Sequence, residues 1–556
     1  MRTEPHPISG MIYEELGDGL VRVSRDSGAF GVFRYDGTYI EGEVTHADVH
    51  FLNYVGGPTL PPAADVFWSV QSVEVPAELN DPDAAGRAYE GVVVPVDDPE
   101  LADAAARDMS QRVVARYVGD KGKMTDKGPR SAGWLSKEEL FALETRPELM
   151  PDIYRADAPM TGGMQRLSVD RYLKREYHDL EVEKLWKRVW QMACHQDDIP
   201  EIGDYQVYDV ASLSFLIVRV SETEIKAYYN ACLHRGRQLR EFGGKRATEF
   251  RCPFHGWSWK IDGAMKEMTC PWDFPDLDPQ NLPLPEVKVG LWAGMVFINP
   301  DPEAGSLEDF LGPSMISQFE KFELEKRWKS AHVARVVDAN WKLTMEAFSE
   351  GWHVIATHPQ TMLAGFDGAN IHYDIFGNFG RGNGNVLLGT SAHRGIIQTP
   401  EEAAAERRDS AAAMRDYLRR LIGDKVDAYS DTEMLDQYFN DLFPNLHPWG
   451  GWARIVFRFL PYGDDHERSV MEVMFLAPWP EDRPKPPAAK IHWVENSWTE
   501  APEIGALARI IDQDFYNIPK VQRGLKTKPD GHVYLSNYAE GFIRNFHQIY
   551  DRYLSS

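Results

Sequence analysis

The sequence predicts an α+β protein built from several domains. Between residues 203 and 300, short apolar runs alternate with Gly, Pro and Asp turns, a pattern typical of a small β domain. From residue 307 onward, helical patterns mix with long strand patterns. Near the start, Asp36-Gly37 separates two strand patterns, and Asp-Gly supplies the positive φ angles of a tight hairpin. A chain of 556 residues is expected to form roughly two to four domains.

Composition and charge exclude several classes of protein. With 43% hydrophobic and 26% charged residues, the chain is expected to be globular. The net charge of −25 argues against nucleic acid or an anionic membrane as the main partner. No apolar run approaches the length of a membrane span, and the first residues carry no apolar signal segment, so we expect a cytoplasmic protein. Two of only four cysteines fall inside a metal pattern, which leaves little for a disulfide framework.

The helices and strands from residue 169 onward are predicted from the periodicity of apolar residues and from residues typical of helix ends. Thr399-Pro-Glu-Glu402 is a capping box with proline at the first helical position, and it opens a charged helix. The stretches 454–460 and 469–476 have the composition of paired strands. The predicted helices cover 169–190, 340–359, 399–422 and 503–522.

The first cluster of metal-ligand residues is Cys232-Leu-His234 followed by Cys252-Pro-Phe-His255. Each loop offers one sulfur and one nitrogen ligand, so one iron of a 2Fe-2S cluster can be held by sulfur and the other by nitrogen. Replacing two thiolates by neutral imidazoles raises the reduction potential into the range of roughly −150 to +300 mV. The alternative is a structural zinc site, although zinc fingers favour pairs of cysteines and pairs of histidines.

The second cluster consists of Glu346, Glu350, His353 and His358, on a predicted helix that ends before proline. The first three share one face, whereas His358 lies about 140° round from His353, so the helix must loosen between them. Two histidines and one carboxylate form a facial triad that leaves iron positions open for dioxygen and substrate. The alternative is a helix with surface carboxylates and two incidental histidines.

A third ligand must come from another segment, and the stretch 510–522 is the candidate. Asp512 and Asp514 differ by two positions and face different sides of a helix, so only one of them can point inward. Spacing alone leaves both open.

The flanks of the first cluster, 230–236 and 251–257, resemble the Rieske motif closely. With the second cluster, they make residues 165–545 resemble the catalytic α subunit of the ring-hydroxylating Rieske non-haem iron oxygenases. The resemblance implies two ligand sets. The Rieske 2Fe-2S ligands would be Cys232, His234, Cys252 and His255. The mononuclear iron ligands would be His353, His358 and Asp514, because the third ligand of the family precedes a Gln by eight residues, as Asp514 precedes Gln522.

Two departures from respiratory Rieske proteins are informative. Arg237 and Phe254 stand where those proteins carry a pair of bridged cysteines. Trp257 stands where they carry a serine that donates a hydrogen bond to the cluster. Losing donors to the sulfurs lowers the reduction potential, which favours an oxygenase fed by a reductase.

The resemblance also implies a domain plan. An accessory domain of unknown role, with a linker, would occupy 1–150. A helical lead-in would occupy 165–200, and the small Rieske β domain 200–303. The catalytic domain, with the helix-grip fold of an antiparallel sheet covered by helices, would occupy 304–556. Within the accessory domain, Thr45-His46-Ala-Asp48-Val-His50 places three potential ligands at strand period, a weak metal signal.

Family members are homotrimers, some with a small β subunit, in which the cluster of one subunit feeds the iron of its neighbour. The resemblance places the connecting carboxylate at Glu350, between His353 and His255 of the partner subunit. It implies a flavoprotein reductase, with or without a ferredoxin, and a small aromatic or hydrophobic substrate that dioxygen hydroxylates, as in aromatic hydrocarbon catabolism.

The usual connecting residue is Asp, and carnitine-type oxygenases share the Glu, so the alternative activity is N/O-demethylation or monooxygenation of a quaternary ammonium substrate. More distant alternatives are a Rieske electron carrier without oxygenase activity and a zinc-stabilised interaction protein.

Overall fold

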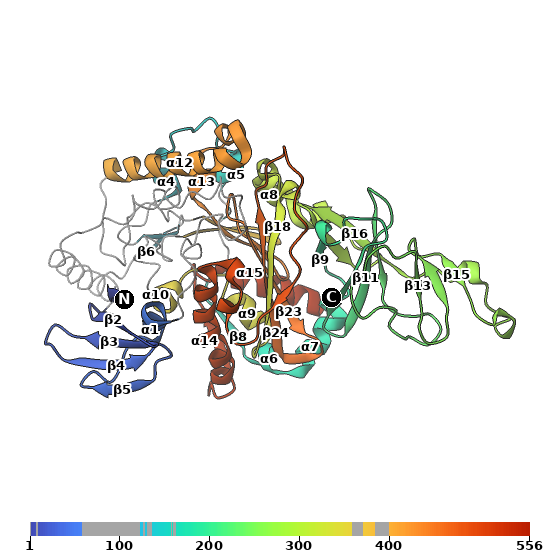
Figure 1. The fold of residues 1–556 in the computed structure, drawn as a ribbon, viewed down its shortest axis with the longest axis horizontal. Coiled ribbons are helices and arrows are strands. Elements are labelled where there is room, and N and C mark those ends of the chain that lie inside the picture. Colours follow the sequence, from blue (N-terminus) through green and yellow to red (C-terminus); the bar gives the residue numbers. More distant parts are fainter. Residues whose placement is uncertain are drawn as a thin grey trace.

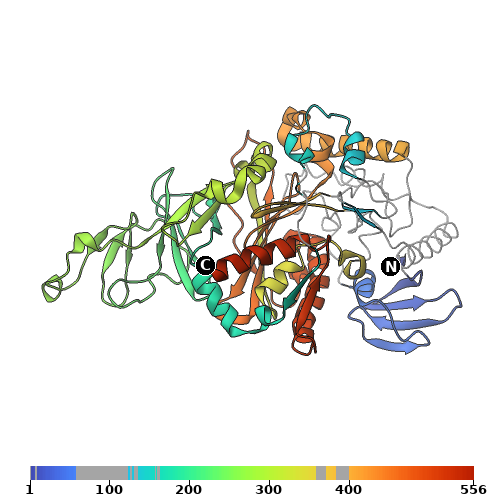
Figure 2. The same cartoon turned by 180° about the vertical axis from the view of Figure 1, so that it is seen from behind.

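The computed structural model describes residues 2–6, 9–57, 123–125, 128–130, 136–156, 158, 163–358, 371–383 and 400–556. These residues form an elongated arrangement with the N-terminal unit at one end and a β-rich unit at the other (Figure 1, Figure 2). A larger mixed unit lies between them and contains the C-terminal helices. The α+β class predicted from the sequence is confirmed.

The N-terminal unit is a five-stranded antiparallel sheet with one helix packed on it. Its strands are joined in chain order: β1 (Thr3–Pro5), β2 (Ile12–Gly17), β3 (Leu20–Ser24), β4 (Phe30–Arg34) and β5 (Tyr39–Gly42). The predicted Asp36-Gly37 hairpin is confirmed: it joins β4 to β5, and Gly37 has a φ of 94°. Helix α1 (Val49–Gly56) buries Phe51 and Leu52 against Tyr13 of the sheet.

Short elements lead from this unit to the rest of the chain. They are the hairpin β6 (Lys123–Thr125) and β7 (Gly128–Arg130), the helices α4 (Lys137–Ala142) and α5 (Asp152–Arg155), and the strand β8 (Gln165–Ser168), which pairs with β26 (His532–Leu535). Lys137 anchors this segment, because its Nζ lies 2.6 Å from the buried carboxylate of Asp374, which also pairs with the buried Arg381 at 2.8 Å.

The continuous helix predicted over 169–190 is wrong. The structure has α6 (Asp170–Leu173), an extended Lys174 and α7 (Arg175–Leu180), followed by one turn of π-helix over Glu181–Trp186. The fully buried carboxylate of Glu181 accepts hydrogen bonds from Trp341 Nε1 at 2.8 Å and from Tyr550 Oη at 2.6 Å. These tertiary contacts hold the π turn in place, and tertiary contacts of this kind override local helix propensity.

The β-rich unit contains a six-stranded antiparallel sheet and a smaller three-stranded sheet. The first has the order β10 (Tyr205–Val210), β11 (Leu213–Arg219), β12 (Ile225–Tyr229), β16 (Glu286–Trp292), β17 (Met295–Asn299) and β9 (Gln191–His195). The second consists of β13 (Glu249–Arg251), β14 (Ser258–Lys260) and β15 (Met265–Glu267) and lies at the far end of the molecule (Figure 1).

The mixed unit is built on an eight-stranded sheet covered by helices. The strand order is β19 (His372–Phe376), β20 (Phe379–Asn383), β21 (Gln437–Leu442), β22 (Leu446–Pro448), β23 (Ile455–Tyr462), β24 (Asp465–Ala477), β18 (Trp328–Val337) and β25 (His492–Trp493). Its helices include α8 (Leu307–Phe319), α9 (Trp341–Glu346), α10 (Val354–Thr357), α12 (Pro400–Ile422), α13 (Asp431–Leu435), α14 (Leu507–Leu525) and α15 (Gly541–Ser555). The predicted pairing of 454–460 with 469–476 is confirmed by β23 and β24, and the predicted charged helix by α12.

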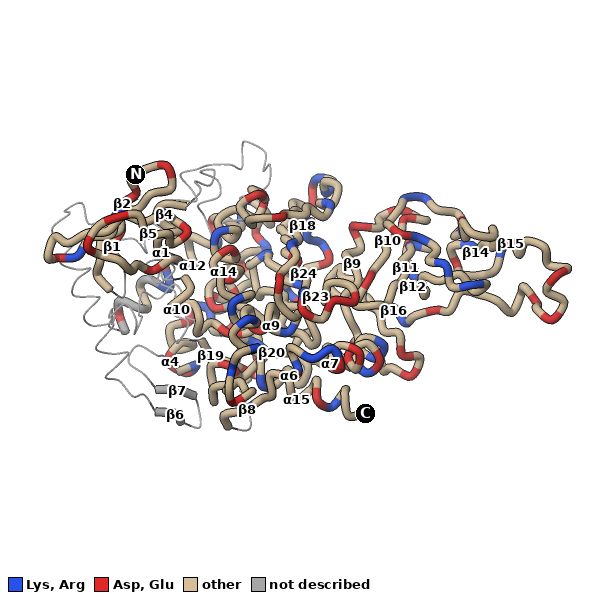
Figure 3. The backbone as a smooth tube through the Cα atoms, turned by 90° about the horizontal axis from the view of Figure 1, so that it is seen from below, with Lys and Arg blue, Asp and Glu red and all other residues tan. Residues whose placement is uncertain are grey.

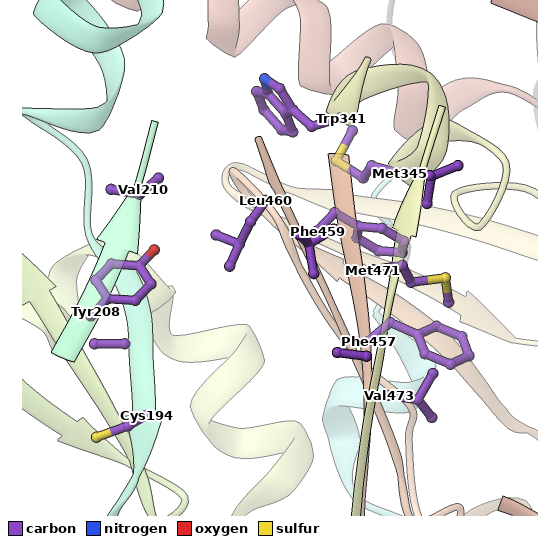
Figure 4. Close-up of a cluster of buried hydrophobic side chains, with 14 of the residues drawn as sticks. Cys194, Tyr208, Val210, Trp341, Met345, Phe457, Phe459, Leu460, Met471 and Val473 are labelled. Atoms are coloured by element: carbon purple, nitrogen blue, oxygen red, sulfur yellow. The ribbon is translucent and has the colours of Figure 1, made fainter. Parts of the chain in front are cut away.

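One hydrophobic core joins the six-stranded sheet to the eight-stranded sheet. Tyr208 and Val210 project from β10 toward Phe459 and Leu460 of β23, with Trp341 of α9 beside them (Figure 4). Acidic residues occur throughout the coloured parts of the backbone, with basic residues among them (Figure 3). Within the described residues, no helix has the length and apolar character that crossing a membrane requires.

Candidate functional site

The two Cys-His loops have the same backbone conformation. In each loop the cysteine carbonyl accepts a hydrogen bond from the glycine N–H four residues later, and the cysteine N–H donates to the carbonyl five residues later. Both glycines need positive φ, 73° and 86°, which glycine adopts without strain. The bonds are Gly236 N to Cys232 O at 2.8 Å, Gly256 N to Cys252 O at 3.0 Å, Cys232 N to Arg237 O at 2.9 Å and Cys252 N to Trp257 O at 2.8 Å.

These loops bring the four predicted cluster residues together. Cys232 and Cys252 are buried, and burial raises the pKa of the Cys232 thiol, with the neighbouring Cys252 thiol adding to the rise. The rings of His234 and His255 lie 4.5 Å apart between centroids. His234 is also stacked on Trp257 at 5.1 Å between centroids.

The donor set fits a 2Fe-2S cluster. His234 Nδ1 is buried and has no hydrogen-bond partner among the described residues, as expected of a nitrogen that binds a metal. The four cysteines are free, so no disulfide ties the two loops, as the residues at Arg237 and Phe254 predicted. His255 and Phe254 are exposed, which leaves this edge of the site open to a partner.

The helix predicted over 340–359 is divided into α9 and α10, so that prediction is wrong in its middle. The Glu350 carboxylate accepts hydrogen bonds from the backbone N–H groups of Trp352 and His353, the latter at 3.0 Å. Such local side-chain bonds to the backbone compete with helix continuation and cap the start of the next turn. As a result, His353 and His358 flank α10 rather than lying on one long helix.

Three side chains converge at this break. One ligand atom from each of His353, His358 and Asp514 lies within 4.8 Å of the others, and the described residues contain no other such group. Asp514, on α14, places Oδ1 2.9 Å from His358 Nε2 and 3.4 Å from His353 Nε2. Two imidazoles and one carboxylate on one side of a point are a donor set that fits a mononuclear iron with open positions.

Hydrogen bonds hold both imidazoles with Nε2 toward this point. Glu350 Oε1 lies 2.6 Å from His353 Nδ1, and Gln513 Oε1 lies 2.8 Å from His358 Nδ1. An acceptor at Nδ1 keeps the proton there, so Nε2 is the nitrogen that each ring presents to a metal. The sequence motif contained Glu350, whereas Gln513 carried no signal beyond its place beside Asp514.

Opposite charges at the site favour the ionised carboxylate. Burial raises the pKa of Asp514, but His358 and His353 outweigh it and lower that pKa to about 2. Burial lowers the pKa of His353, but Glu350 and Asp514 outweigh it and raise it to about 10. The carboxylate is therefore ionised, and a metal ion that binds there displaces a proton from the histidine.

The structure separates the two aspartates that the sequence left open. Asp512 faces away from the histidines: its Oδ1 accepts from Trp498 N at 2.9 Å and from Arg335 Nη1 at 3.1 Å. It therefore fastens the loop before α14, whereas Asp514 is 4% exposed and faces both histidines.

Glu346, named in the sequence motif, lies in a buried network that sequence reasoning did not find. Its Oε1 accepts from His547 Nε2 at 2.8 Å and from Tyr172 Oη at 3.1 Å. Arg171 Nη1 donates to His547 Nδ1 at 2.9 Å, which fixes the proton of that ring on Nε2. Burial raises the pKa of Glu346 to about 8.

The weak metal signal at residues 45–50 does not form a site. Asp48 is the N-cap of α1 and accepts from the backbone of His50 and Phe51 at 2.8 and 3.2 Å. His46 is exposed and hydrogen-bonds to Thr45.

Two family models match the chain over these two sites. Residues 189–278 match the Rieske [2Fe-2S] domain, and residues 319–556 match the catalytic domain of the ring hydroxylating alpha subunit. The chain thus combines a Rieske domain with a ring-hydroxylating alpha-subunit catalytic domain. These domains imply a Rieske cluster and one mononuclear iron.

Curated relatives include a dioxygenase and a monooxygenase. The chain is 33% identical over 205 residues to the anthranilate 1,2-dioxygenase large subunit of Acinetobacter baylyi, covering 35% of this chain and 43% of the relative. It is 29% identical over 189 residues to the carnitine monooxygenase oxygenase subunit of Escherichia coli, covering 34% of this chain and 50% of the relative. The chain thus spans half or less of the length of these relatives.

Solved structures share the fold. A variant of naphthalene 1,2-dioxygenase bound to phenanthrene aligns with a TM-score of 0.53 at 20% identity, over 72% of this chain and 94% of that one. A quaternary ammonium Rieske monooxygenase in complex with L-carnitine aligns with a TM-score of 0.52 at 18% identity, over 73% and 99%.

Proposed function

We propose that this chain is the catalytic subunit of an oxygenase that uses reductase-derived electrons and dioxygen to hydroxylate an aromatic or hydrophobic organic substrate. The observation that carries the proposal is the convergence of His353, His358 and Asp514 in a chain that also has the paired Cys-His loops. Bound in these sites, the cluster supplies one-electron transfer and the iron supplies dioxygen activation. Cys232, His234, Cys252 and His255 would hold the first group, and the convergent triad the second.

The arrangement of the two sites supports electron transfer between subunits. The β13–β15 sheet, which carries the second Cys-His loop, lies at one end of the molecule, whereas α10 and α14 lie in the mixed unit away from it (Figure 1, Figure 2). Trp352, beside Glu350, is 50% exposed, and Phe254, beside His255, is 56% exposed. Exposed aromatic residues next to both connecting groups are suited to burial between two copies of the chain.

Glu350 would then connect the two centres in a homotrimer. It holds the Nδ1 proton of His353 within its own chain. The role proposed for it is to meet His255 of the partner subunit and pass the electron between them. A separate flavoprotein reductase, with or without a ferredoxin, would supply the electrons. A small β subunit is compatible with this assembly.

A second candidate is oxidation of a methylated or quaternary ammonium substrate. Glu350 favours it, because the carnitine-type oxygenases share a glutamate where ring-hydroxylating members have aspartate. The match to the carnitine monooxygenase subunit points in the same direction.

Iron and sulfide analysis tests the proposal most directly. The purified chain is expected to be red-brown, with three irons and two acid-labile sulfides per chain. Two irons would indicate an electron carrier, and a colourless zinc protein would indicate a structural site. Incubation with NADH, a surrogate reductase and a panel of aromatics, steroids and methylated amines should then separate ring hydroxylation from demethylation. A three-iron protein that oxidises no member of so broad a panel would contradict the proposed substrate classes.

A further inference from the structure

Helix α1 of the N-terminal unit lies against the proposed iron site. The main-chain carbonyl of His50 accepts a hydrogen bond from Gln513 Nε2 at 3.0 Å. The His50 imidazole pairs with Asn517 Nδ2 at 3.2 Å and packs edge-on against Tyr516, with 5.5 Å between ring centroids. Asn517 also reaches Thr357 Oγ1 of α10 at 3.3 Å. Figure 1 shows α1 next to α10.

The Gln513 side chain connects α1 to His358. A carbonyl oxygen can only accept a hydrogen bond, so the His50 carbonyl requires the NH2 group of the Gln513 amide on its side. The amide oxygen must then face His358 Nδ1, which lies 2.8 Å away. That oxygen is an acceptor, so His358 Nδ1 carries a proton, and Nε2 is the nitrogen that faces Asp514 Oδ1, 2.9 Å away, where a metal would bind. A backbone group of the N-terminal unit thus selects the tautomer of His358.

The N-terminal sheet in turn holds α1 in place. Asp48 caps α1 with its Oδ1, and its Oδ2 lies 3.1 Å from His6 Nε2 of the sheet region. The backbone N–H of Asp48 donates to Tyr13 Oη at 2.9 Å, and Tyr13 is fully buried in the sheet core. The position of the His50 carbonyl is therefore set by the folded N-terminal unit.

We infer that the N-terminal unit is a working part of the mononuclear iron site, with the His50 carbonyl and Gln513 as positioning groups for His358. This inference rests on the proposed function, because it takes His353, His358 and Asp514 as the iron ligands. It gives a role to an accessory unit whose role the sequence left unknown. Outer partners of metal-bound histidines fix ring orientation and raise ligand basicity, and losing one weakens metal binding by roughly tenfold to a hundredfold.

The first test measures Fe(II) affinity of the full-length chain under anaerobic conditions, while the visible spectrum of the Rieske cluster reports on the rest of the fold. Gln513→Leu is expected to weaken Fe(II) binding by roughly tenfold to a hundredfold and to leave the cluster spectrum unchanged. Arg523→Leu, an exposed position on the same helix, is the control and should bind Fe(II) as the wild type does.

The second test perturbs α1 without touching the catalytic domain. Asp48→Ala removes the N-cap of α1, and Ser306→Ala removes the equivalent cap of α8, far from the site. We expect Asp48→Ala to weaken Fe(II) binding several-fold and Ser306→Ala to leave it unchanged. In the double variant with Gln513→Leu, the loss should be smaller than the product of the two single losses, because both changes act through one contact.

The thermodynamic linkage between iron binding and the docking of α1 gives a second measurement. A purely structural role of Gln513 would leave this measurement unchanged. If α1 strengthens iron binding, iron must strengthen the docking of α1 by the same factor. Hydrogen exchange of the α1 amides should therefore slow when Fe(II) binds to the wild type, and Gln513→Leu should abolish that change. If Fe(II) leaves the exchange rates of the α1 amides unchanged, and if Gln513→Leu and Asp48→Ala bind Fe(II) with wild-type affinity, this inference is wrong and the proposed function still stands. A wild-type chain that takes up no third iron would overturn the proposed function as well.

Discussion

Glu350 Oε1 lies 2.6 Å from Nδ1 of His353, while the other oxygen of the same carboxylate accepts from the backbone N–H of His353 at 3.0 Å. One carboxylate thus shapes the chain break before α10 and orients an imidazole. The Glu350 side chain keeps 11% exposure, beside the half-exposed Trp352, and in the proposed trimer this is where another subunit would approach it.

Replacing Glu350 by Ala is expected to lower product formation about a hundredfold or more even at saturating Fe(II), because the proposed connection between subunits is lost. The three proposed ligand side chains are untouched, so saturating Fe(II) should still give three irons per chain, although the loss of the acceptor at His353 Nδ1 weakens Fe(II) binding. Iron analysis and single-turnover product measurement check this. Glu303→Ala, an exposed carboxylate elsewhere, is the control. Normal turnover in Glu350→Ala would refute the connecting role.

Replacing Asp514 by Ala is expected to lower the iron content from three to two per chain, because the buried carboxylate between the two histidines is gone. Asp512→Ala serves as the matched control on the same helix. It should lower the melting temperature, since Trp498 N and Arg335 lose their acceptor, yet keep the third iron. Loss of iron in Asp512→Ala alone would reverse the assignment of the two aspartates.

The stability of the catalytic domain should fall as pH rises through the range in which Glu346 ionises. Burial raises the folded-state pKa of Glu346 from 4.5 to about 8. Between these values the folded state binds more protons than the unfolded state, so the contribution is fully present below pH 4.5 and is lost as pH rises through about 8.

Glu346→Gln removes this dependence, because its amide oxygen can accept from His547 and Tyr172 without titrating. The difference in free energy of unfolding between the wild type and Glu346→Gln should change by at most about 1.4 kcal/mol per pH unit between the unfolded-state and folded-state pKa values of Glu346. Thermal unfolding of both proteins at several pH values measures it. If the free energy of unfolding depends on pH in the same way in the wild type and in Glu346→Gln, the pKa of Glu346 is not raised.

Arg381→Ala should destabilise the chain by about 3–5 kcal/mol, because it leaves the buried carboxylate of Asp374 with one cation instead of two. Lys137→Ala removes the other partner, which is less completely buried, and should cost less. Denaturant unfolding compares them. A larger loss in Lys137→Ala than in Arg381→Ala would contradict this order.

The metal motifs and their family were predictable from sequence because their ligands are close in the chain and chemically distinctive. The Cys-His loops repeat one short pattern, and His353 and His358 are five residues apart. What the sequence could not provide was any feature set by distant partners. The π turn at Glu181 depends on Trp341 and Tyr550, and the place of Gln513 depends on a backbone carbonyl more than 400 residues away in sequence. The helix through 340–359 was mispredicted because periodicity does not reveal that Glu350 turns back onto its own backbone.

The hydrophobic core that runs unbroken from Tyr208 and Phe215 to Phe459 and Trp498 has a mechanical consequence. Two sheets that share one interior cannot hinge about each other without opening that interior to water. The two sheets are therefore expected to move as one rigid body. If electrons pass between subunits as proposed, the distance that they cross is set by how the subunits assemble and not by movement of one sheet against the other.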